Sequence, residues 1–250
     1  MKIIACYSNK GGVGKTATSV NLAYASAMAG RSTLLCDLDP QGASGFYFRV
    51  KPSKKLRNKA FFKDVQGFLD AIRASDFDNL DLLPANLTYR DFDIFLSRMK
   101  NSRSRLKKAL MELDSDYDVI ILDCPPNISL LSENVFKTAD KIVVPVIPTT
   151  LSVRTFEQLN DFFKENEYQR KKLLPFFSMV QKSKKLHKDT MLTLRKNYKS
   201  LLKNYIPFSS EIEKMGVYRA PVMTFAGKNS AADAYSKIWH EIEAQVKIGK

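Results

Sequence analysis

The sequence predicts an α/β fold in which a doubly wound, mostly parallel sheet carries helices on both faces. Short apolar runs alternate along the chain with longer segments in which apolar residues recur at helical spacing. The runs are continuously apolar, which is typical of strands covered on both faces, as in a parallel sheet. A chain of 250 residues is long enough for one well-filled core. We therefore expect residues 1–250 to form a single domain.

The expected elements follow this alternation in chain order. Strands are expected at the apolar runs Ile3–Tyr7, Thr33–Cys36, Leu80–Leu83, Val119–Leu122, Ile142–Ile147 and Phe176–Val180. Helices are expected in the segments of helical period, Thr16–Ala29, Val65–Ala74, Tyr89–Leu113, Leu130–Lys137, Val153–Glu165, Lys188–Leu202 and Ala231–Val246. The first helix is closed by Gly30, a residue that suits a helix C-terminus. The last helix carries its apolar residues on one face, as a core-facing helix does.

Charge is spread unevenly along the chain. There are 40 Lys and Arg residues against 26 Asp and Glu residues, a formal net charge of +14. Residues 49–63 carry +7, residues 98–108 carry +6 and residues 164–219 carry +9, so the remainder carries −8. A hydrophobic content of 44% excludes disorder throughout. The basic stretches predict attraction to a polyanion, either nucleic acid or an acidic membrane.

The cysteines and the amino terminus indicate the compartment. Cys6, Cys36 and Cys124 lie inside apolar runs, the usual place for a small buried residue in a reducing compartment. They form no readable disulfide framework. The amino-terminal segment turns polar after Tyr7, too soon for a signal peptide or a membrane span. We therefore expect a cytoplasmic protein.

A glycine-rich loop joins the first expected strand to the first expected helix, and it reads Ser8-Asn9-Lys10-Gly11-Gly12-Val13-Gly14-Lys15-Thr16. Glycines let backbone amides turn around phosphate oxygens, Lys15 can neutralise the β- and γ-phosphates, and the Thr16 hydroxyl can ligate Mg²⁺. The loop departs from G-x-x-x-x-G-K-[ST] because its first position is Asn9 and Lys10 precedes the glycines. We expect nucleotide phosphates to be bound by Lys10, Gly11, Gly12, Val13, Gly14, Lys15, Thr16 and Ala17.

Two further motifs accompany the loop, Asp37-Leu38-Asp39-Pro40-Gln41-Gly42 and Ile120-Ile121-Leu122-Asp123-Cys124-Pro125-Pro126. With Lys10–Thr16 as a deviant Walker A motif, Asp37–Gly42 as switch I and Ile120–Pro126 as Walker B with switch II, the sequence resembles the ParA/MinD group of deviant-Walker ATPases. Within that group it is most similar to the small Soj-like ParA partition ATPases. The resemblance implies a P-loop NTPase fold and a slow ATP hydrolase with ATP and Mg²⁺ as cofactors.

Carboxylates end two of the expected strands near the loop. Asp37 and Asp39 flank Leu38, and carboxylates beside a phosphate site are costly unless a metal ion or a water needs them. Asp123 ends an apolar strand, where it can hold Mg²⁺ through water. The resemblance implies that Asp39 orients or activates the attacking water and that Asp37 lies nearer the metal. We thus expect Thr16, Asp37, Asp39 and Asp123 at the metal, with strand-end capping as an equal alternative for Asp37.

Lys10 is the most informative single residue. The resemblance implies that it reaches across a face-to-face homodimer to the phosphates of the partner subunit, so that ATP binding and dimerisation become one event. Gly11 has to stay small for the subunits to approach. Lys10, Lys15 and Asp39 form the expected catalytic set.

Two polyanions compete for the basic stretches. MinD-type relatives carry a terminal amphipathic helix, whereas only residues 247–250 follow the last expected helix, so we expect no membrane anchor. The resemblance implies a carboxy-terminal surface for nonspecific DNA that is continuous only in the ATP-bound dimer. The expected contacts are Lys182, Lys184, Lys185, Arg195, Lys196, Lys199, Lys214 and Arg219. The phosphate loop starts so near residue 1 that we expect no operator-reading domain, and stretches 49–63 and 98–108 either extend the DNA surface or bind a partner.

The sequence thus favours an ATPase that dimerises around ATP, binds nucleoid DNA nonspecifically and positions a plasmid, a chromosome or a protein body. A ParB-like or cargo-adaptor protein would stimulate its hydrolysis. The alternative is a MinD-like, membrane-associated positioning ATPase. An iron–sulfur reductase is disfavoured because only Cys124 lies near switch II. ATP as a purely structural ligand of a DNA-binding protein stays open.

Overall fold

The computed structural model describes residues 1–52, 65–227 and 230–248, and their strands form an eight-stranded sheet in the order β3-β4-β2-β5-β1-β6-β7-β8. Neighbouring strands are parallel except for the β3–β4 pair at one edge. The strands are β1 (Lys2–Cys6), β2 (Thr33–Asp37), β3 (Arg73–Ala74), β4 (Leu80–Leu83), β5 (Val119–Asp123), β6 (Lys141–Val146), β7 (Leu173–Val180) and β8 (Tyr205–Pro207). The mostly parallel sheet predicted from the apolar runs is confirmed.

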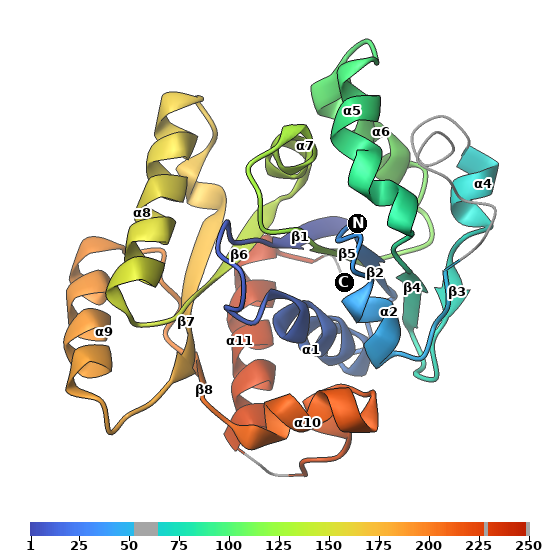
Figure 1. Cartoon of the computed structure of the whole chain (residues 1–250). Helices are drawn as coiled ribbons and strands as arrows, with labels where there is room; N and C mark the ends of the chain where they lie inside the picture. The colour runs from blue at the N-terminus through green and yellow to red at the C-terminus, as the bar shows by residue number, and fades with distance from the viewer. Residues whose placement is uncertain (53–64, 228–229, 249–250) are drawn as a thin grey trace.

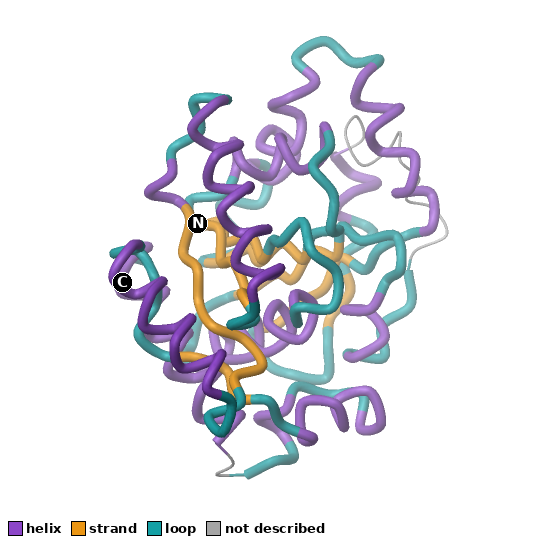
Figure 2. Tube along the Cα trace, turned by 60° about the vertical axis from the view of Figure 1, so that its left-hand side comes forward, coloured by secondary structure: helices purple, strands orange, loops and turns teal. Residues whose placement is uncertain are grey.

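Helices cover both faces of this sheet. One face carries α4 (Val65–Leu69), α5 (Phe92–Ser97), α6 (Arg105–Met111), α7 (Leu130–Thr138), α8 (Thr150–Glu165) and α9 (Lys185–Asn197), and the other carries α1 (Lys15–Met28), α2 (Ala43–Tyr47), α10 (Ser210–Tyr218) and α11 (Ser230–Val246) (Figure 1). Figure 2 shows the strands as a central layer between the helices. Each face has its own apolar cluster. Leu34 and Leu35 belong to different clusters because successive side chains of a strand point to opposite faces.

The carboxyl ends of β1, β5 and β2 lie side by side near the middle of the sheet. Cys6 of β1 pairs in register with Asp123 of β5, and Asp123 pairs in register with Asp37 of β2. All five residues of β5 are buried, as are all five of β2. In open α/β sheets, ligands bind outside the carboxyl ends of the strands, where the chain connections diverge. We therefore expect a ligand-binding site at this edge of the sheet.

The expectation of one helix over Tyr89–Leu113 is wrong. The structure divides the segment into the 3₁₀ turn η1 (Leu87–Asp91), α5, the turn η2 (Ser102–Ser104) and α6. Between α5 and α6 the backbone of Asn101 is left-handed, with φ of 55°. The hydroxyls of Ser97 and Ser104 each donate to the carbonyl oxygen three residues earlier, which offers the chain an alternative to helix. Polar residues between the two apolar halves therefore break the helix.

Two other expected helices have different bounds. The helix expected over Val65–Ala74 ends at Leu69, and β3 takes up its last residues as an edge strand. The helix expected over Lys188–Leu202 is α9, which begins and ends earlier. The N–H of Leu202 donates instead to the carbonyl oxygen of Pro175 in β7, because that contact joins the chain to the sheet. The sequence pattern did not predict α2, α10, β3 or β8.

Candidate phosphate-binding site

The glycine-rich loop lies between β1 and α1, at the carboxyl edge of the sheet (Figure 1). Gly12 and Gly14 have φ of 71° and 90°, in the left-handed region that favours glycine. A Cβ on Gly14 would lie 3.3 Å from the Ser178 Oγ atom, so space also disfavours a side chain there. The 14-residue helix α1 begins at Lys15 without a side-chain cap. Its first amides therefore point to a site that an anion such as phosphate fits.

The two predicted lysines of the loop differ in their partners. Lys15 is 8% exposed, and its Nζ atom donates to the Lys10 carbonyl oxygen at 3.1 Å. An ammonium has three donors, so two remain for anionic oxygens. The Lys10 side chain is half-buried, and its ammonium makes no hydrogen bond or ion pair with any residue that the structure describes. The Lys15 ammonium is thus held within the chain, whereas the Lys10 ammonium has no partner among the described residues.

Asp123 is a buried carboxylate surrounded by hydroxyl groups. Its Oδ1 atom accepts from the Ser19 hydroxyl at 3.1 Å, and its Oδ2 atom accepts from the Ser44 hydroxyl at 2.8 Å. Burial raises the pKa of Asp123 to about 6, although hydrogen bonds from Ser44, Thr16 and Ser19 lower it. The Thr16 hydroxyl, the predicted metal ligand of the loop, therefore lies beside the predicted carboxylate of β5.

Asp37 lies on the neighbouring strand and is also buried. Its two oxygens accept from the backbone N–H groups of Asp39 at 3.1 Å and Ser44 at 3.0 Å. Burial raises the pKa of Asp37 well above its ordinary value, and the adjacent Asp123 raises it further. Two buried carboxylates side by side are costly when both are ionised, and a cation at this edge would reverse that cost.

The donor set at this edge fits a hydrated Mg²⁺ ion. No group of three or more His, Cys, Asp and Glu side chains that could hold a metal is found within residues 1–52, 65–227 and 230–248. The predicted ligands that do come together are the Thr16 hydroxyl and the Asp123 carboxylate, with Asp37 next to them. Mg²⁺ keeps several waters and is usually bound through one or two protein oxygens plus substrate phosphates. An ion here would take its remaining ligands from water and phosphate.

Asp39 lies in a different environment from Asp37. It follows β2, is half-buried, and accepts from the N–H of Gln41 at 3.0 Å. It lines an open cavity of about 410 Å³ together with Leu38, Pro40, Gln41, Tyr89, Arg90, Phe92, Asp93, Pro125, Pro126, Asn127, Ser129 and Leu131. The carboxylate of Asp37 is therefore buried at the end of a strand, whereas that of Asp39 faces a space large enough for water.

Sequence reasoning missed two residues of the site, Ser19 and Ser44. Ser19 stands four residues after Lys15 on α1, so the two lie on the same face of the helix, and this spacing could have indicated it. Ser44 bridges Asp37 and Asp123 through its amide and its hydroxyl. It is 79 residues from Asp123 in the chain, and no local pattern could have indicated that contact.

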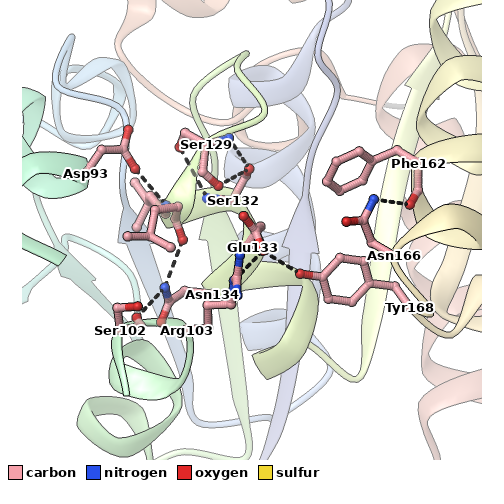
Figure 3. Close-up of polar contacts among 12 residues, drawn as sticks. Asp93, Ser102, Arg103, Ser129, Ser132, Glu133, Asn134, Phe162, Asn166 and Tyr168 are labelled. Carbon is pink, nitrogen blue, oxygen red and sulfur yellow. Dashed lines mark hydrogen bonds and ion pairs between the residues drawn. The ribbon is translucent and has the colours of Figure 1, made fainter. Parts of the chain in front are cut away.

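The segment after Asp123 leads into α7, whose first turns are tied to three other elements (Figure 3). Ser129 and Ser132 form a capping box at its start. The carboxylate of Asp93 on α5 accepts from the N–H at the second position of α7 at 2.8 Å. Glu133 accepts from Arg103 at 2.7 Å and from the Tyr168 hydroxyl at 2.9 Å. The expected switch II therefore has one end on buried β5 and the other on a firmly held helix.

The eight basic residues expected at DNA divide between two helices. Six exposed ones lie on α9 or beside it, namely Lys182, Lys184, Lys185, Arg195, Lys196 and Lys199. The other two belong to α10: Lys214 pairs with Glu211 at 2.8 Å, and the Arg219 Nε atom donates to the Phe46 carbonyl oxygen at 3.0 Å. Of the remaining basic stretches, 98–108 lies on η2, α6 and the preceding loop, and most of 49–63 lies outside the described residues.

The chain is similar to known proteins over nearly its whole length. Residues 1–176 match the family model described as an AAA domain. The chain is similar to the sporulation initiation inhibitor protein Soj of Bacillus subtilis (strain 168), with 29% identity over 250 residues that cover 97% of this chain and 98% of that protein.

Solved structures show the same fold. Cobyrinic acid a,c-diamide synthase from Mycobacterium smegmatis, with bound ATP analogue and magnesium, is similar with a TM-score of 0.82 and 26% identity over 100% of this chain and 97% of that chain. A plasmid partition protein from Borrelia burgdorferi has a TM-score of 0.79 and 22% identity, covering 98% of this chain and 99% of that chain. In the described part of the chain, no helix is both long and apolar enough to span a membrane.

Proposed function

Because the chain belongs to the ParA/MinD family of ATPases and is similar to its Soj-like members, we propose that it dimerises around ATP, binds DNA nonspecifically in that state and positions a cargo. Residues 1–250 act as one domain in this cycle. A ParB-like or cargo-adaptor protein stimulates hydrolysis and ends the DNA-bound state. In this proposal the protein works in the cytoplasm at the nucleoid.

The residues at the sheet edge support ATP and Mg²⁺ as ligands. The loop amides and the buried Lys15 ammonium offer donors to the β- and γ-phosphates. Thr16 and Asp123 lie where they can hold Mg²⁺, with Asp37 beside them. When bound, Mg²⁺ neutralises charge on the phosphates and the leaving group. Asp39 faces the open cavity and orients the attacking water there.

The observation that carries the dimer proposal is the environment of Lys10. Its backbone carbonyl oxygen receives Lys15, whereas its own ammonium has no partner among the described residues. A half-buried cation beside a phosphate loop gains most from an anion, and the phosphates held by a second subunit supply one. Apart from its chain neighbours, no described residue has an atom within 4 Å of a Cβ placed on Gly11, so the loop leaves room for a second subunit to approach.

The cations around α9 support DNA as the polyanion. They are exposed and lie within residues 182–199, and exposed cations bind a phosphodiester backbone without reading the sequence. The alternative is a MinD-like membrane-associated ATPase, which would attach at the bilayer surface through an amphipathic helix. Binding to vesicles of acidic phospholipid tests for such an attachment.

The test measures binding of a labelled random-sequence duplex by anisotropy, without nucleotide, with ADP and with ATP. We expect binding with ATP only, weakening steeply with salt. Asp39→Ala retains or prolongs binding because the ATP that holds the dimer together is no longer hydrolysed. Lys10→Ala abolishes binding. Lys137→Ala, at the exposed end of α7, is the matched lysine control and binds as the wild type does.

Two outcomes would contradict the proposal. Equal DNA binding in all three nucleotide states would show that the bound nucleotide does not control DNA binding. Preferential ATP-dependent binding to vesicles of acidic phospholipid, in the same buffer, would favour the membrane-associated alternative.

A further inference from the structure

The short helix α2 connects the expected switch I to the two buried carboxylates. Ser44, its second residue, donates its N–H to the Asp37 Oδ2 atom at 3.0 Å and its hydroxyl to the Asp123 Oδ2 atom at 2.8 Å. All three side chains are fully buried or nearly so. A shift of α2 therefore changes the hydrogen bonds of both carboxylates at once.

The other end of α2 is held by two arginines. The Arg219 Nε atom donates to the Phe46 carbonyl oxygen at 3.0 Å, and its guanidinium lies 4.7 Å from the centre of the Phe46 ring. Arg49, just after α2, donates to the Tyr218 carbonyl oxygen at 2.9 Å. Contacts thus run in both directions between the end of α2 and the end of α10.

The backbone at both arginines is unusual. Arg219 has φ of 50° and Arg49 has φ of 58°, a left-handed conformation that is uncommon for residues other than glycine. Such residues persist where their surroundings fix them, and they concentrate at functional positions. Phe46 is 50% exposed, so the arginine that covers its ring is not required to bury a core residue.

α10, which ends just before Arg219, and the segment after it are anchored to the phosphate-loop helix α1. Asn21, buried on α1, donates to the Met215 Sδ atom of α10 at 3.2 Å and accepts from the N–H of Val222 at 2.9 Å. Because α1 begins at Lys15, α10 is a support fixed to the phosphate site. Through the contacts of Arg219 and Arg49, this anchored segment holds the end of α2 in place.

We propose that Arg219 is a positioning residue for ATP hydrolysis, not a DNA contact. By holding Phe46 and the end of α2 against α10, it keeps Ser44 on Asp37 and Asp123. Arg219 acts through these residues and touches none of the expected ligands. The inference rests on the proposed ATP hydrolysis, and it assigns Arg219 a different role from the one that its charge predicts.

A lysine at position 219 tests the effect of the positive charge separately from that of the shape of the side chain. Arg219→Lys keeps the positive charge that a DNA contact needs, but it loses the Nε donor and the planar group over the Phe46 ring. Arg219→Gln loses both. We expect each variant to lower kcat for ATP hydrolysis about tenfold with a much smaller change in KM, because a misplaced catalytic group costs rate more than binding. Phe46→Leu, which removes only the stacking partner, lowers kcat about threefold by the same reasoning.

DNA affinity is measured in the Asp39→Ala background, where hydrolysis no longer influences it. There we expect Arg219→Lys and Arg219→Gln to retain both the affinity and its salt dependence. The matched control for hydrolysis is Arg73→Gln. Arg73 is an exposed arginine of the edge strand β3 that, among the described residues, hydrogen-bonds to the carbonyl oxygens of Asp70 and Ile72. Unfolding midpoints of all variants show whether a loss of rate is a loss of folding.

Normal hydrolysis by Arg219→Lys, together with weaker DNA binding by Arg219→Gln, would overturn the proposal and restore Arg219 as a DNA contact. A fall in rate that follows the unfolding midpoint, and is absent in Phe46→Leu, would also overturn it. An absence of ATP hydrolysis in the wild-type protein would instead refute the proposed function itself.

Discussion

The phosphate edge of the sheet and the cationic surface around α9 differ in how much depends on a single residue. At the sheet edge the charged groups are buried and have defined partners: Lys15 bonds a carbonyl oxygen and Asp123 is bonded by Ser19 and Ser44. Around α9 the cations are exposed. Electrostatic interactions are strong where water is excluded, whereas water and salt screen them at a surface. Single substitutions should therefore matter at the first region, and total charge at the second.

The largest effect is expected for Lys15→Ala. Loss of the buried ammonium should lower the rate of ATP hydrolysis about 1,000-fold, since removing one preorganised donor to developing charge costs about 10²–10³-fold. Single-turnover hydrolysis with excess protein measures it, with Lys137→Ala as the exposed lysine control. A reduction below about tenfold would place Lys15 with the surface cations and end the contrast between the two regions.

Asp123→Asn tests how much the ionised, buried carboxylate lowers the free energy of unfolding of the nucleotide-free protein. The pKa of Asp123 is raised by burial from 3.8 to about 6. The folded state therefore holds this proton more tightly than the unfolded state, so the stabilisation is present below pH 4 and is lost as the pH rises through 6. Asparagine does not titrate. Its free energy of unfolding relative to wild type should thus increase by about 2 kcal/mol from pH 4 to pH 7.

Urea unfolding of both proteins at several pH values measures this difference. The comparison cancels the titrating groups that do not interact with Asp123. Asp37, whose pKa Asp123 raises, contributes to the difference as the other member of a coupled pair. A constant difference across the pH range would show that folding does not shift the pKa of Asp123, and that water reaches the sheet edge more than its burial indicates.

A smaller effect is expected for the triple variant Lys184→Gln, Lys185→Gln and Lys196→Gln on the α9 surface. Each exposed cation that meets a phosphate releases about one counterion, so the slope of log affinity against log salt should decrease by about three. Anisotropy titrations of the ATP-bound protein at four salt concentrations give the slope. An unchanged slope would remove α9 from the DNA surface.

The smallest effect is expected for Lys214→Gln. This lysine lies on α10, and its ammonium already pairs with Glu211 at 2.8 Å. Removing it leaves the six cations around α9 in place, so the salt slope should change by less than one. The same titrations check this. A decrease as large as that of the triple variant would mean that α10, and not α9, carries the DNA surface.

Residues of the site could be predicted where their neighbours in space are neighbours in the chain. Lys10 to Thr16 form one strand–loop–helix unit, so their position follows from local sequence, and Asp123 ends an apolar run that can only be a strand. Ser44 could not be predicted, since it meets Asp123 only after β2 and β5 pair. The bond of Arg219 to Phe46 joins residues 173 positions apart, and charge alone predicted a different role.

Secondary structure follows the same rule. Buried strands were predicted within a few residues because a parallel sheet demands continuous apolar runs. The helix expected over Tyr89–Leu113 failed because its apolar period continues across Asn101, where serine hydroxyls bond the backbone instead. The edge strands β3 and β8 are only two and three residues long, and their pairing with the sheet defines them, not their pattern.

The parallel sheet, the phosphate loop and the total positive charge could be predicted from the sequence, because periodicity, glycine placement and composition are local properties. The different environments of the three aspartates and the division of the cations between α9 and α10 depend on tertiary contacts. Sheet pairing buries Asp37 against Asp123, and the chain beyond β2 leaves Asp39 beside an open cavity. The packing of α2 on α10 binds Arg219 at Phe46, while α9 keeps its cations exposed. Burial and partners are set by contacts between distant segments, and those exist only in the folded chain.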